Sequence, residues 1–202
     1  MVTIENAQLQ QAEELLEIYA WYVQNTAITF EWDVPSLTEF RQRIADTQTR
    51  FPWLVLRDGG RILGYGYLSA FHPRKAYEWC AETSIYLDHD LRGKGYGRKL
   101  YEALEEAAGA MGILNLNACI ACPKGEADEY LSDASIRFHE HLGYSLVGEF
   151  HDCGFKFSRW YDMVWMEKML GIHEENPAPV IVYPDIAARC DNDIDRIERN
   201  QR

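Results

Sequence analysis

Hydrophobic residues recur at three- and four-residue spacing in two segments near the start of the chain. The first segment, Ala7–Asn25, follows an apolar stretch at residues 2–4 that predicts a short strand. The second, Leu37–Thr47, begins directly after Ser36, and Glu39 three residues further on completes the sequence pattern of a capping box. Because side chains three and four residues apart share one face of a helix, the pattern predicts two amphipathic helices.

Apolar runs in the middle of the chain predict strands. Trp53–Arg57 and Arg61–Leu68 are separated by Asp58-Gly59-Gly60, which is a strong hairpin signal because these residues adopt the backbone angles of tight turns. A further run at Trp79–Leu87 continues the pattern. We therefore expect strands that pair in an antiparallel meander.

The second half of the chain changes from strands back to helices. A glycine-rich stretch precedes a helical pattern over residues 100–111, Ile113–Ala121 predicts a strand, and Asp133–Leu142 predicts a last core helix. Gly143 follows where a left-handed C-cap is expected. Because strands and helices do not alternate strictly, the order predicts a mixed α/β (α+β) fold.

The composition is that of an ordinary globular protein with one main domain. The chain has 202 residues, of which 47% are hydrophobic and 26% charged. We assign residues 1–170 to this domain and residues 171–202 to a tail, because the Asn176-Pro-Ala-Pro stretch breaks the pattern. No apolar run is long enough to span a bilayer, and Glu5 stands where a secretory signal would carry basic residues, so we expect a cytoplasmic protein.

The charge balance argues against a nucleic-acid or membrane partner. The chain carries 20 Lys and Arg against 32 Asp and Glu, a net charge of -12, which repels polyanions. Against this background Arg92, Lys94, Arg98 and Lys99 fall within eight residues. This local concentration of positive charge predicts an anion-binding site.

The cysteines and histidines do not form a convincing metal site. The five cysteines, an odd number, predict reduced thiols rather than a disulfide framework: Cys80, Cys119, Cys122, Cys153 and Cys190. Cys119 and Cys122 have the spacing of a zinc or redox motif, but positions three apart on a strand face opposite sides. His139 and His141, two apart on a helix, do not chelate either. A zinc or redox protein stays an alternative that metal analysis would decide.

The stretch from Arg92 to Gly97 lies between a predicted strand and a predicted helix. Glycines without a Cβ let consecutive backbone N–H groups converge, and the helix that follows adds its positive end, so a pyrophosphate fits. Arg92, Lys94 and Arg98 would neutralise the remaining charge. The stretch lacks the Gly-Lys-Ser/Thr end of a Walker A motif and does not match a Rossmann fingerprint. A loop that only turns the chain is the simpler alternative.

The pattern Arg92-x-x-Gly95-x-Gly97 resembles the acetyl-CoA motif of the GNAT N-acetyltransferase superfamily. Ala76–Leu87, Ser135–Tyr144 and Gly154–Asp162 resemble the phosphinothricin and methionine sulfoximine acetyltransferase branch. The likeness covers about residues 2–170. It implies a mostly antiparallel sheet splayed at the acetyl-CoA site and flanked by helices. It also implies acetyl-CoA as co-substrate, no metal, and a homodimer.

The resemblance places the cofactor between two diverging strands. Backbone groups of Ile85, Tyr86 and Leu87 would pair with the pantetheine arm. Further cofactor contacts are expected from these residues: Arg92, Gly93, Lys94, Gly95, Tyr96, Gly97, Arg98, Ser132 and Ser135. Ser132 stands where relatives carry an asparagine, and it follows an acidic insertion at residues 124–131.

Three catalytic residues are implied by the same resemblance. Glu82 matches the family's proposed base, and its apolar strand setting would raise the pKa of a carboxyl group; an exposed strand carboxylate is the alternative. His139 matches an assisting histidine, and a packed core histidine is the alternative. Tyr144 is a candidate acid for the departing thiolate, although packing is the more ordinary role of such an aromatic residue.

The acceptor pocket is expected from an N-terminal loop and from the segment that precedes and begins the strand predicted at Trp79–Leu87. Phe30 and Glu31 belong to the first loop. Arg74 would bind an acceptor carboxylate in bidentate fashion, and a surface arginine is the alternative. Tyr77 and Trp79 would supply apolar walls or belong to the core.

These residues lead to one hypothesis of function with named alternatives. We expect transfer of an acetyl group from acetyl-CoA to the amino group of a small amino-acid-like acceptor, of the phosphinothricin, methionine sulfoximine or methionine sulfone type. The acetyl group would pass directly from acetyl-CoA to the acceptor, and Glu82 would act as the base. The alternatives are a non-catalytic acetyl-CoA sensor and a GNAT enzyme that acts on a polyamine or a protein N-terminus.

Overall fold

The computed structural model describes residues 2–91 and 93–187 of the chain. Arg92 and Cys190, both named above, lie outside the described residues. The elements follow one another in this order: β1 (Val2–Asn6), η1 (Leu9–Gln11), α1 (Ala12–Asn25), α2 (Leu37–Gln48), β2 (Trp53–Asp58), β3 (Arg61–Ala70), η2 (Lys75–Tyr77), β4 (Cys80–Leu87), η3 (His89–Leu91), α3 (Tyr96–Met111), β5 (Asn115–Cys122), α4 (Ala134–His141), β6 (Ser145–Lys156) and β7 (Arg159–Met169).

The predicted helices and strands are present, with shifts at their ends. The first helix begins at Ala12 rather than Ala7, because a separate 3-10 turn, η1, precedes it. Ser36 caps α2 as expected, its Oγ accepting from Glu39 N at 3.2 Å. The Glu39 carboxylate accepts from Arg43 at 2.6 Å. The structure therefore shows the serine half of the predicted capping box.

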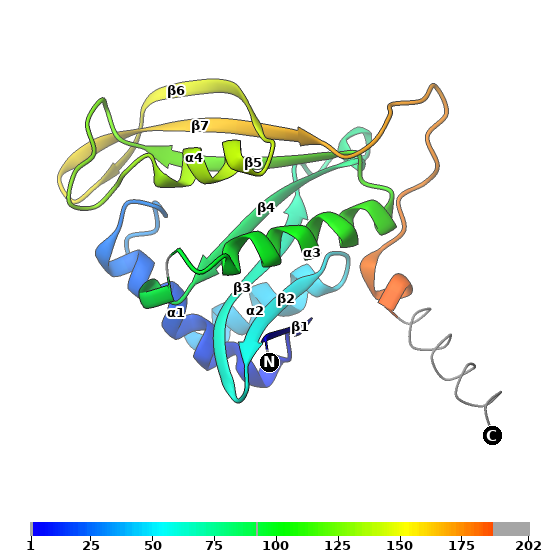
Figure 1. Ribbon diagram of the computed structural model, residues 1–202, viewed down its shortest axis with the longest axis horizontal. Coiled ribbons are helices and arrows are strands. Elements are labelled where there is room, and N and C mark those ends of the chain that lie inside the picture. The colour runs from blue at the N-terminus through cyan, green and yellow to red at the C-terminus, as the bar shows by residue number, and fades with distance from the viewer. Residues whose placement is uncertain (1, 92, 188–202) are drawn as a thin grey trace.

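One seven-stranded sheet runs through the molecule in the order β1-β2-β3-β4-β5-β7-β6 (Figure 1). Every neighbouring pair is antiparallel except β4 and β5, which are parallel. The expected mixed fold with a mostly antiparallel sheet is thus confirmed.

The parallel pair β4 and β5 separates soon after it begins. The two strands are paired only at Cys80–Asn115, Ala81–Leu116 and Glu82–Asn117. Beyond Glu82 they diverge, and Figure 1 shows the sheet opening into two wings at this point. The splay that the resemblance implied is therefore a property of this chain.

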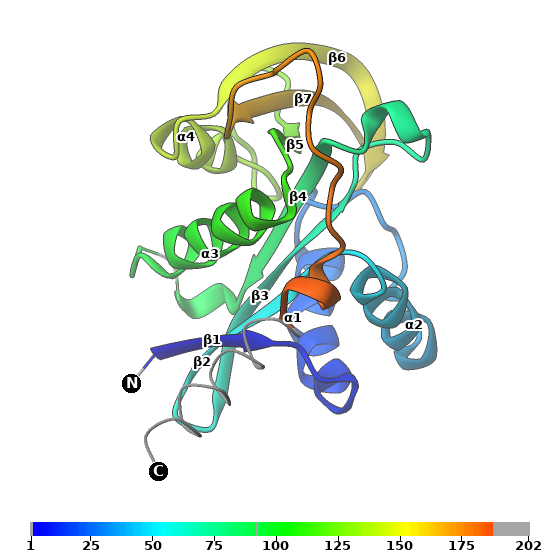
Figure 2. The same ribbon diagram turned by 90° about the vertical axis from the view of Figure 1, so that its right-hand side faces the viewer.

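Helices cover both faces of the sheet (Figure 2). α3 and α4 lie on one side of the strands, and α1 and α2 lie on the other. The α3 side encloses a large core that includes Leu100, Leu104 and Met111. The α1–α2 side encloses a second, aromatic-rich core with Trp53 and Tyr65. None of the helices within residues 2–91 and 93–187 has both the length and the apolar character needed to cross a bilayer.

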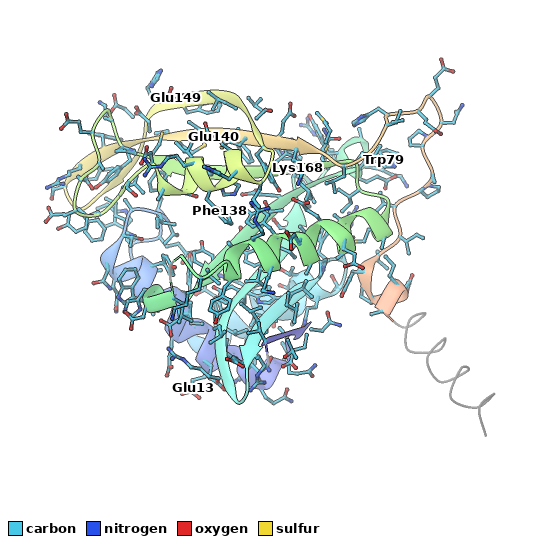
Figure 3. The ribbon with its side chains drawn as sticks, viewed as in Figure 1. Glu13, Trp79, Phe138, Glu140, Glu149 and Lys168 are labelled. Carbon is cyan, nitrogen blue, oxygen red and sulfur yellow. The ribbon has the colours of Figure 1, made fainter. Side chains whose placement is uncertain are left out.

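The described part of the C-terminal tail lies against the domain. Ile181 N donates to Met111 O, and Tyr183 N donates to Arg50 O, both at 2.9 Å. The indole of Trp79 donates to Ala178 O at 2.9 Å. This contact lies at the end of the sheet remote from the glycine loop, the name used below for Gly93–Gly97 (Figure 3). Trp79, expected as a wall of the acceptor pocket, therefore serves in this structure to hold the tail.

Candidate active site

A cavity of about 850 Å³ opens where β4 and β5 diverge. Its walls come from the C-terminal end of α1, the free part of β4, the glycine loop, β5 and the start of α4. Among the residues that line it are Tyr22, Thr26, Thr83, Ile85, Tyr86, Leu87, Gly93, Lys94, Gly95, Tyr96, Gly97, Arg98, Tyr101, Cys119, Ser132, Ser135, Phe138 and His139. The structure thus brings together the described residues of the expected cofactor site.

The glycine loop presents the start of α3 to this cavity. Gly93 and Gly95 have φ angles of 76° and 78°, a left-handed conformation that side chains rarely adopt. Gly95 is the N-cap of α3 and offers no side-chain cap, and the first turn contains no acidic residue. Lys94 and Arg98 are exposed beside it. The helix N-terminus therefore offers amide donors and positive charge to a phosphate group.

Gly97 has a different role from the other two glycines. It is helical and buried, and a Cβ added to it would lie 3.0 Å from the ring of Phe138 and 3.4 Å from Ile85. Phe138 extends from α4 toward α3 (Figure 3). The third glycine therefore permits close packing of α3 against α4, rather than the bending of the loop.

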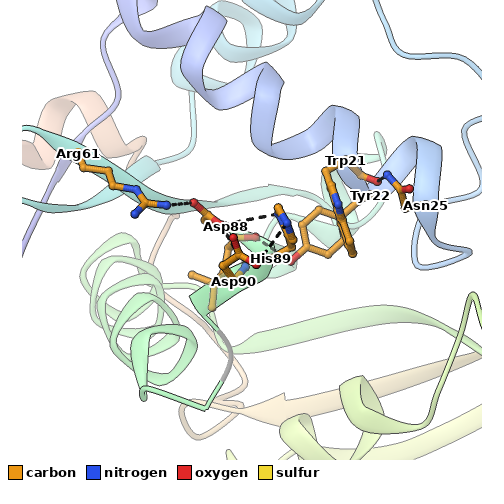
Figure 4. A network of polar contacts seen from close by, with 8 residues as sticks. Trp21, Tyr22, Asn25, Arg61, Asp88, His89 and Asp90 are labelled. Carbon is orange, nitrogen blue, oxygen red and sulfur yellow. Dashed lines mark hydrogen bonds and ion pairs between the residues drawn. The ribbon is translucent and has the colours of Figure 1, made fainter.

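A polar network fixes the turn between β4 and the glycine loop (Figure 4). Asp88 pairs with Arg61, and the His89 ring stacks on Trp21 with 4.4 Å between ring centroids. Tyr22 donates its hydroxyl to Leu87 O at 2.7 Å. These contacts tie the end of β4 to α1, so the free edge of the strand has a fixed position beside the cavity.

Residues 85–87 pair with β3 on one side and face the gap on the other. Ile85 opposes Gly66, Tyr86 opposes Tyr65, and Leu87 opposes Gly64. In the part of the chain that the structure describes, β4 has no strand partner on its β5 side beyond Glu82. This edge can therefore accept an extended chain such as a pantetheine arm, as a further strand would pair.

Glu82 lies at the last paired position before the gap. Since residues alternate along a strand, its side chain points to the α1–α2 face, whereas Thr83 points to α3. The Glu82 carboxylate adds to the rise that burial causes in the pKa of Tyr67 and of the cavity residue Cys119. Burial also raises the pKa of Glu82 itself. The carboxyl group is thus half-buried at the opening between the two faces.

His139 and Tyr144 lie behind the cavity on the α3–α4 side. His139 is buried and lines the cavity, and its Nε2 is 2.5 Å from the hydroxyl of Tyr101. Tyr144 is also buried but is not a lining residue, and burial raises the pKa of its hydroxyl, which lies beside Thr83. An acid role for Tyr144 draws no support from this arrangement.

The N-terminal loop that was predicted to form part of the acceptor pocket packs against β6, in the hairpin that β6 forms with β7. The ring of Phe30 lies so close to Gly154 that a Cβ there would be 2.3 Å from it. Glu31 pairs with Arg43 at 2.6 Å. The Trp32 indole donates to Phe155 O at 3.0 Å. The loop is thereby fixed on the α1–α2 side of the gap, the side to which Glu82 points.

Lys156 holds the loop that follows α1, which borders the cavity at Thr26, and the sequence analysis missed it. Its ammonium group donates to Thr26 O at 2.9 Å and to Thr29 O at 2.7 Å, and the residue is 3% exposed. Burial lowers its pKa to about 8, while Glu31 acts in the opposite direction. A lysine flanked by two phenylalanines in a strand was the available signal, but its partners lie 127 and 130 residues away.

The sequence matches the model of the acetyltransferase (GNAT) domain over residues 4–165. This chain belongs to the GNAT acetyltransferase family. It is 34% identical to a phosphinothricin N-acetyltransferase of Alcaligenes faecalis, over 76% of this chain and 75% of the relative. It is also 34% identical to an L-methionine sulfoximine/L-methionine sulfone acetyltransferase of Pseudomonas aeruginosa, over 82% and 92% of the two chains.

Solved structures agree with this placement. A GNAT superfamily phosphinothricin acetyltransferase from Sinorhizobium meliloti, in complex with AcCoA, superposes with a TM-score of 0.78 at 33% identity. The match covers 90% of this chain and 98% of the other. The predicted family, the acetyl-CoA-dependent acyltransferase class and acetyl-CoA as co-substrate are therefore confirmed.

Ser132 and Ser135 both reach the cavity of this GNAT domain, but through different groups. Ser132 Oγ accepts from Ala134 N at 3.4 Å, at the start of α4. The carbonyl of Ser135 lies 2.7 Å from His139 Nδ1. The Ser132 hydroxyl is thus engaged by the start of α4.

The remaining acceptor candidates lie on an exposed loop of the GNAT domain. Arg74 is exposed at the start of η2. Tyr77 packs against Phe71 with 5.9 Å between ring centroids, and Phe71 contacts Trp165 of β7. Neither Arg74 nor Tyr77 lines the cavity. Their place in the acceptor site stays a prediction.

The two cysteines of the CxxC spacing face opposite sides, as predicted. Cys119 lines the cavity, and Cys122 is buried in the core. Burial raises the pKa of Cys119 to about 12 and that of Cys122 to about 11. Raised thiol pKa values disfavour the thiolate that metal binding and redox exchange require.

Proposed function

We propose that this enzyme acetylates the amino group of a small amino-acid-like acceptor, with Glu82 as the base. The proposal rests on the position of Glu82 at the opening of the sheet, between the cofactor cavity and the α1–α2 face. The relatives named for phosphinothricin, methionine sulfoximine and methionine sulfone support an acceptor of that class.

In this proposal the two substrates reach the gap from opposite faces of the sheet. The thioester end of acetyl-CoA enters from the α3 side through the gap beside β4. The acceptor enters from the α1–α2 side, where Phe30 and Glu31 form one wall and Arg74 and Tyr77 lie on a second loop. Arg74 is exposed and therefore free to pair with an acceptor carboxylate in bidentate fashion.

The chemistry requires an uncharged amine. Glu82 removes a proton from the acceptor ammonium, directly or through a water molecule, and the nitrogen lone pair attacks the thioester carbonyl. The carbon–sulfur bond then breaks, the sulfur takes a proton, and the nitrogen loses its second proton as the amide forms. A carboxyl group with a raised pKa suits this task because its basicity is closer to that of the amine.

An acceptor panel tests this function directly. We expect free thiol release from acetyl-CoA with methionine sulfone, methionine sulfoximine or phosphinothricin, at a kcat/KM at least tenfold above that for polyamines or peptide N-termini. A tenfold preference corresponds to about 1.4 kcal/mol of transition-state binding. Preference for a polyamine or peptide would refute the acceptor class. Tight acetyl-CoA binding without turnover of any acceptor would favour the sensor alternative.

We also propose that the enzyme forms a homodimer through β6, the edge strand of the sheet. Its exposed apolar side chains include Leu146 at 62%, Val147 at 58% and Phe150 at 55% exposure. Exposed apolar patches of this kind mark protein–protein contacts. Light scattering should give twice the mass of the 23.4 kDa chain, and Phe150→Glu should shift it toward one chain. A monomeric wild type would contradict the proposal.

The proposed location is the cytoplasm. Cys80, Cys119, Cys122 and Cys153 are all free thiols in the described structure, which fits a reducing compartment.

A further inference from the structure

A buried polar chain borders the cavity on the side opposite Glu82. Tyr101 of α3 is 1% exposed, Thr83 of β4 is 5% exposed and His139 of α4 is 6% exposed. All three line the cavity. Tyr101 lies at one of the positions that the sequence pattern marks only as the apolar face of a helix.

The hydrogen bonds of this chain define where the protons are. His139 Nδ1 lies 2.7 Å from the carbonyl oxygen of Ser135, and a carbonyl only accepts, so Nδ1 carries a hydrogen. Burial lowers the pKa of His139, which favours the neutral ring. Nε2 then holds a lone pair. The hydroxyl of Tyr101, 2.5 Å away, must be the donor to it.

Tyr101 keeps its own proton when it donates a hydrogen bond to His139. Burial raises the pKa of Tyr101 well above its ordinary value, and the nearby carboxylates of Glu105 and Glu82 act in the same direction. Thr83 lies 3.3 Å from the Tyr101 hydroxyl and donates to Asn117 O at 3.2 Å. Thr83 can therefore only accept from Tyr101, but its Oγ is 3.3 Å away against 2.5 Å for His139 Nε2, so the Tyr101 hydrogen is directed to the closer acceptor, His139.

We propose that Tyr101 is a positioning residue of the acetyl-transfer site, which holds His139 neutral and occupies its only free ring nitrogen. This inference rests on the proposed function. It revises the role that the family resemblance implied for His139, because an imidazole with both nitrogens engaged cannot take a proton from the acceptor. Glu82 is then the base, and His139 forms an uncharged wall opposite it.

Nuclear magnetic resonance of the histidine ring nitrogens tests the arrangement without any acceptor. At pH 7 wild-type His139 should show the neutral form protonated at Nδ1. In Tyr101→Phe the donor to Nε2 is lost, and the His139 pKa should rise toward the ordinary value of about 6.5. Tyr144→Phe is the matched control, because Tyr144 contacts His139 through its ring, which the variant keeps, and it should leave the His139 pKa unchanged.

Turnover supplies a second readout. A higher His139 pKa leaves more of the rings charged at pH 6 in Tyr101→Phe than in the wild type, and a cation beside the cavity disfavours an acceptor ammonium. The ratio of Tyr101→Phe to wild-type turnover should therefore be lower at pH 6 than at pH 8. Adding His139→Gln removes the titrating group, so this extra pH dependence should disappear in the double variant.

The outcomes separate the two proposals. A wild-type His139 protonated at Nε2, or an unchanged His139 pKa in Tyr101→Phe, would overturn the positioning role. The wild-type spectrum alone decides the tautomer, even if the variant does not fold. If no acceptor is acetylated while the spectra are as expected, the proposed function fails and the Tyr101–His139 contact stands.

Discussion

Replacing Glu82 by glutamine should lower turnover at pH 7 by at least about 100-fold, which is the lower range of general acid–base catalysis. The amide has nearly the same shape but cannot accept the proton of the acceptor ammonium. Acetyl-CoA affinity should stay within about twofold by calorimetry, because Glu82 is not among the residues that line the cofactor cavity. Glu106→Gln, on the exposed face of α3, makes the same chemical change as a control.

The pH dependence of turnover tests whether the ionised form of Glu82 is the active one. Burial raises the pKa of Glu82, and only the ionised carboxylate acts as base. Wild-type turnover should therefore fall as pH decreases through this raised pKa, in addition to the loss caused by protonation of the amine. Glu82→Gln should show only the dependence of the amine. Unchanged turnover in this variant would remove Glu82 from the mechanism.

Local features of the fold were predictable from sequence because they depend on near neighbours. The α2 cap at Ser36 and the hairpin at Gly59 both follow from residues within a few positions. The divergence of β4 from β5 has no such local signal, since Cys80–Leu87 is a continuous strand that simply loses its partner. It could be expected only from the family resemblance.

The part of the candidate site that the sequence predicted best is the glycine loop, because its backbone conformation depends on the glycines of the motif itself. Gly93 and Gly95 have positive φ angles, which use the conformational freedom for which the loop pattern selects glycine. Tyr101 and Lys156 were missed because their partners come from distant segments, 38 residues away for His139 and more than a hundred for Thr26. The contact of Trp79 with the tail was not predicted, because its partner Ala178 lies 99 residues away in the sequence.

The close approach of β3 and β4 at Gly64 leads to the largest expected effect on stability. A Cβ at Gly64 would lie 2.6 Å from the carbonyl oxygen of Tyr86 and 2.9 Å from the Cα of Leu87. Backbone atoms cannot move aside as a side-chain end can, so Gly64→Ala must push β4 away from β3. Overpacking of this kind costs about 1–3 kcal/mol.

We expect Gly64→Ala to lower the Tm by roughly 2–12 °C, the range that this free energy gives for a chain of this size. Gly60→Ala in the same hairpin is the matched control, because nothing lies within 4 Å of its added Cβ, and its Tm should change little. The displaced residues are those that form the free edge of β4 beside the cavity. Acetyl-CoA affinity should therefore fall in Gly64→Ala and not in Gly60→Ala. Equal stability and affinity in the two variants would mean that β4 is not held at the position on which the cofactor site depends.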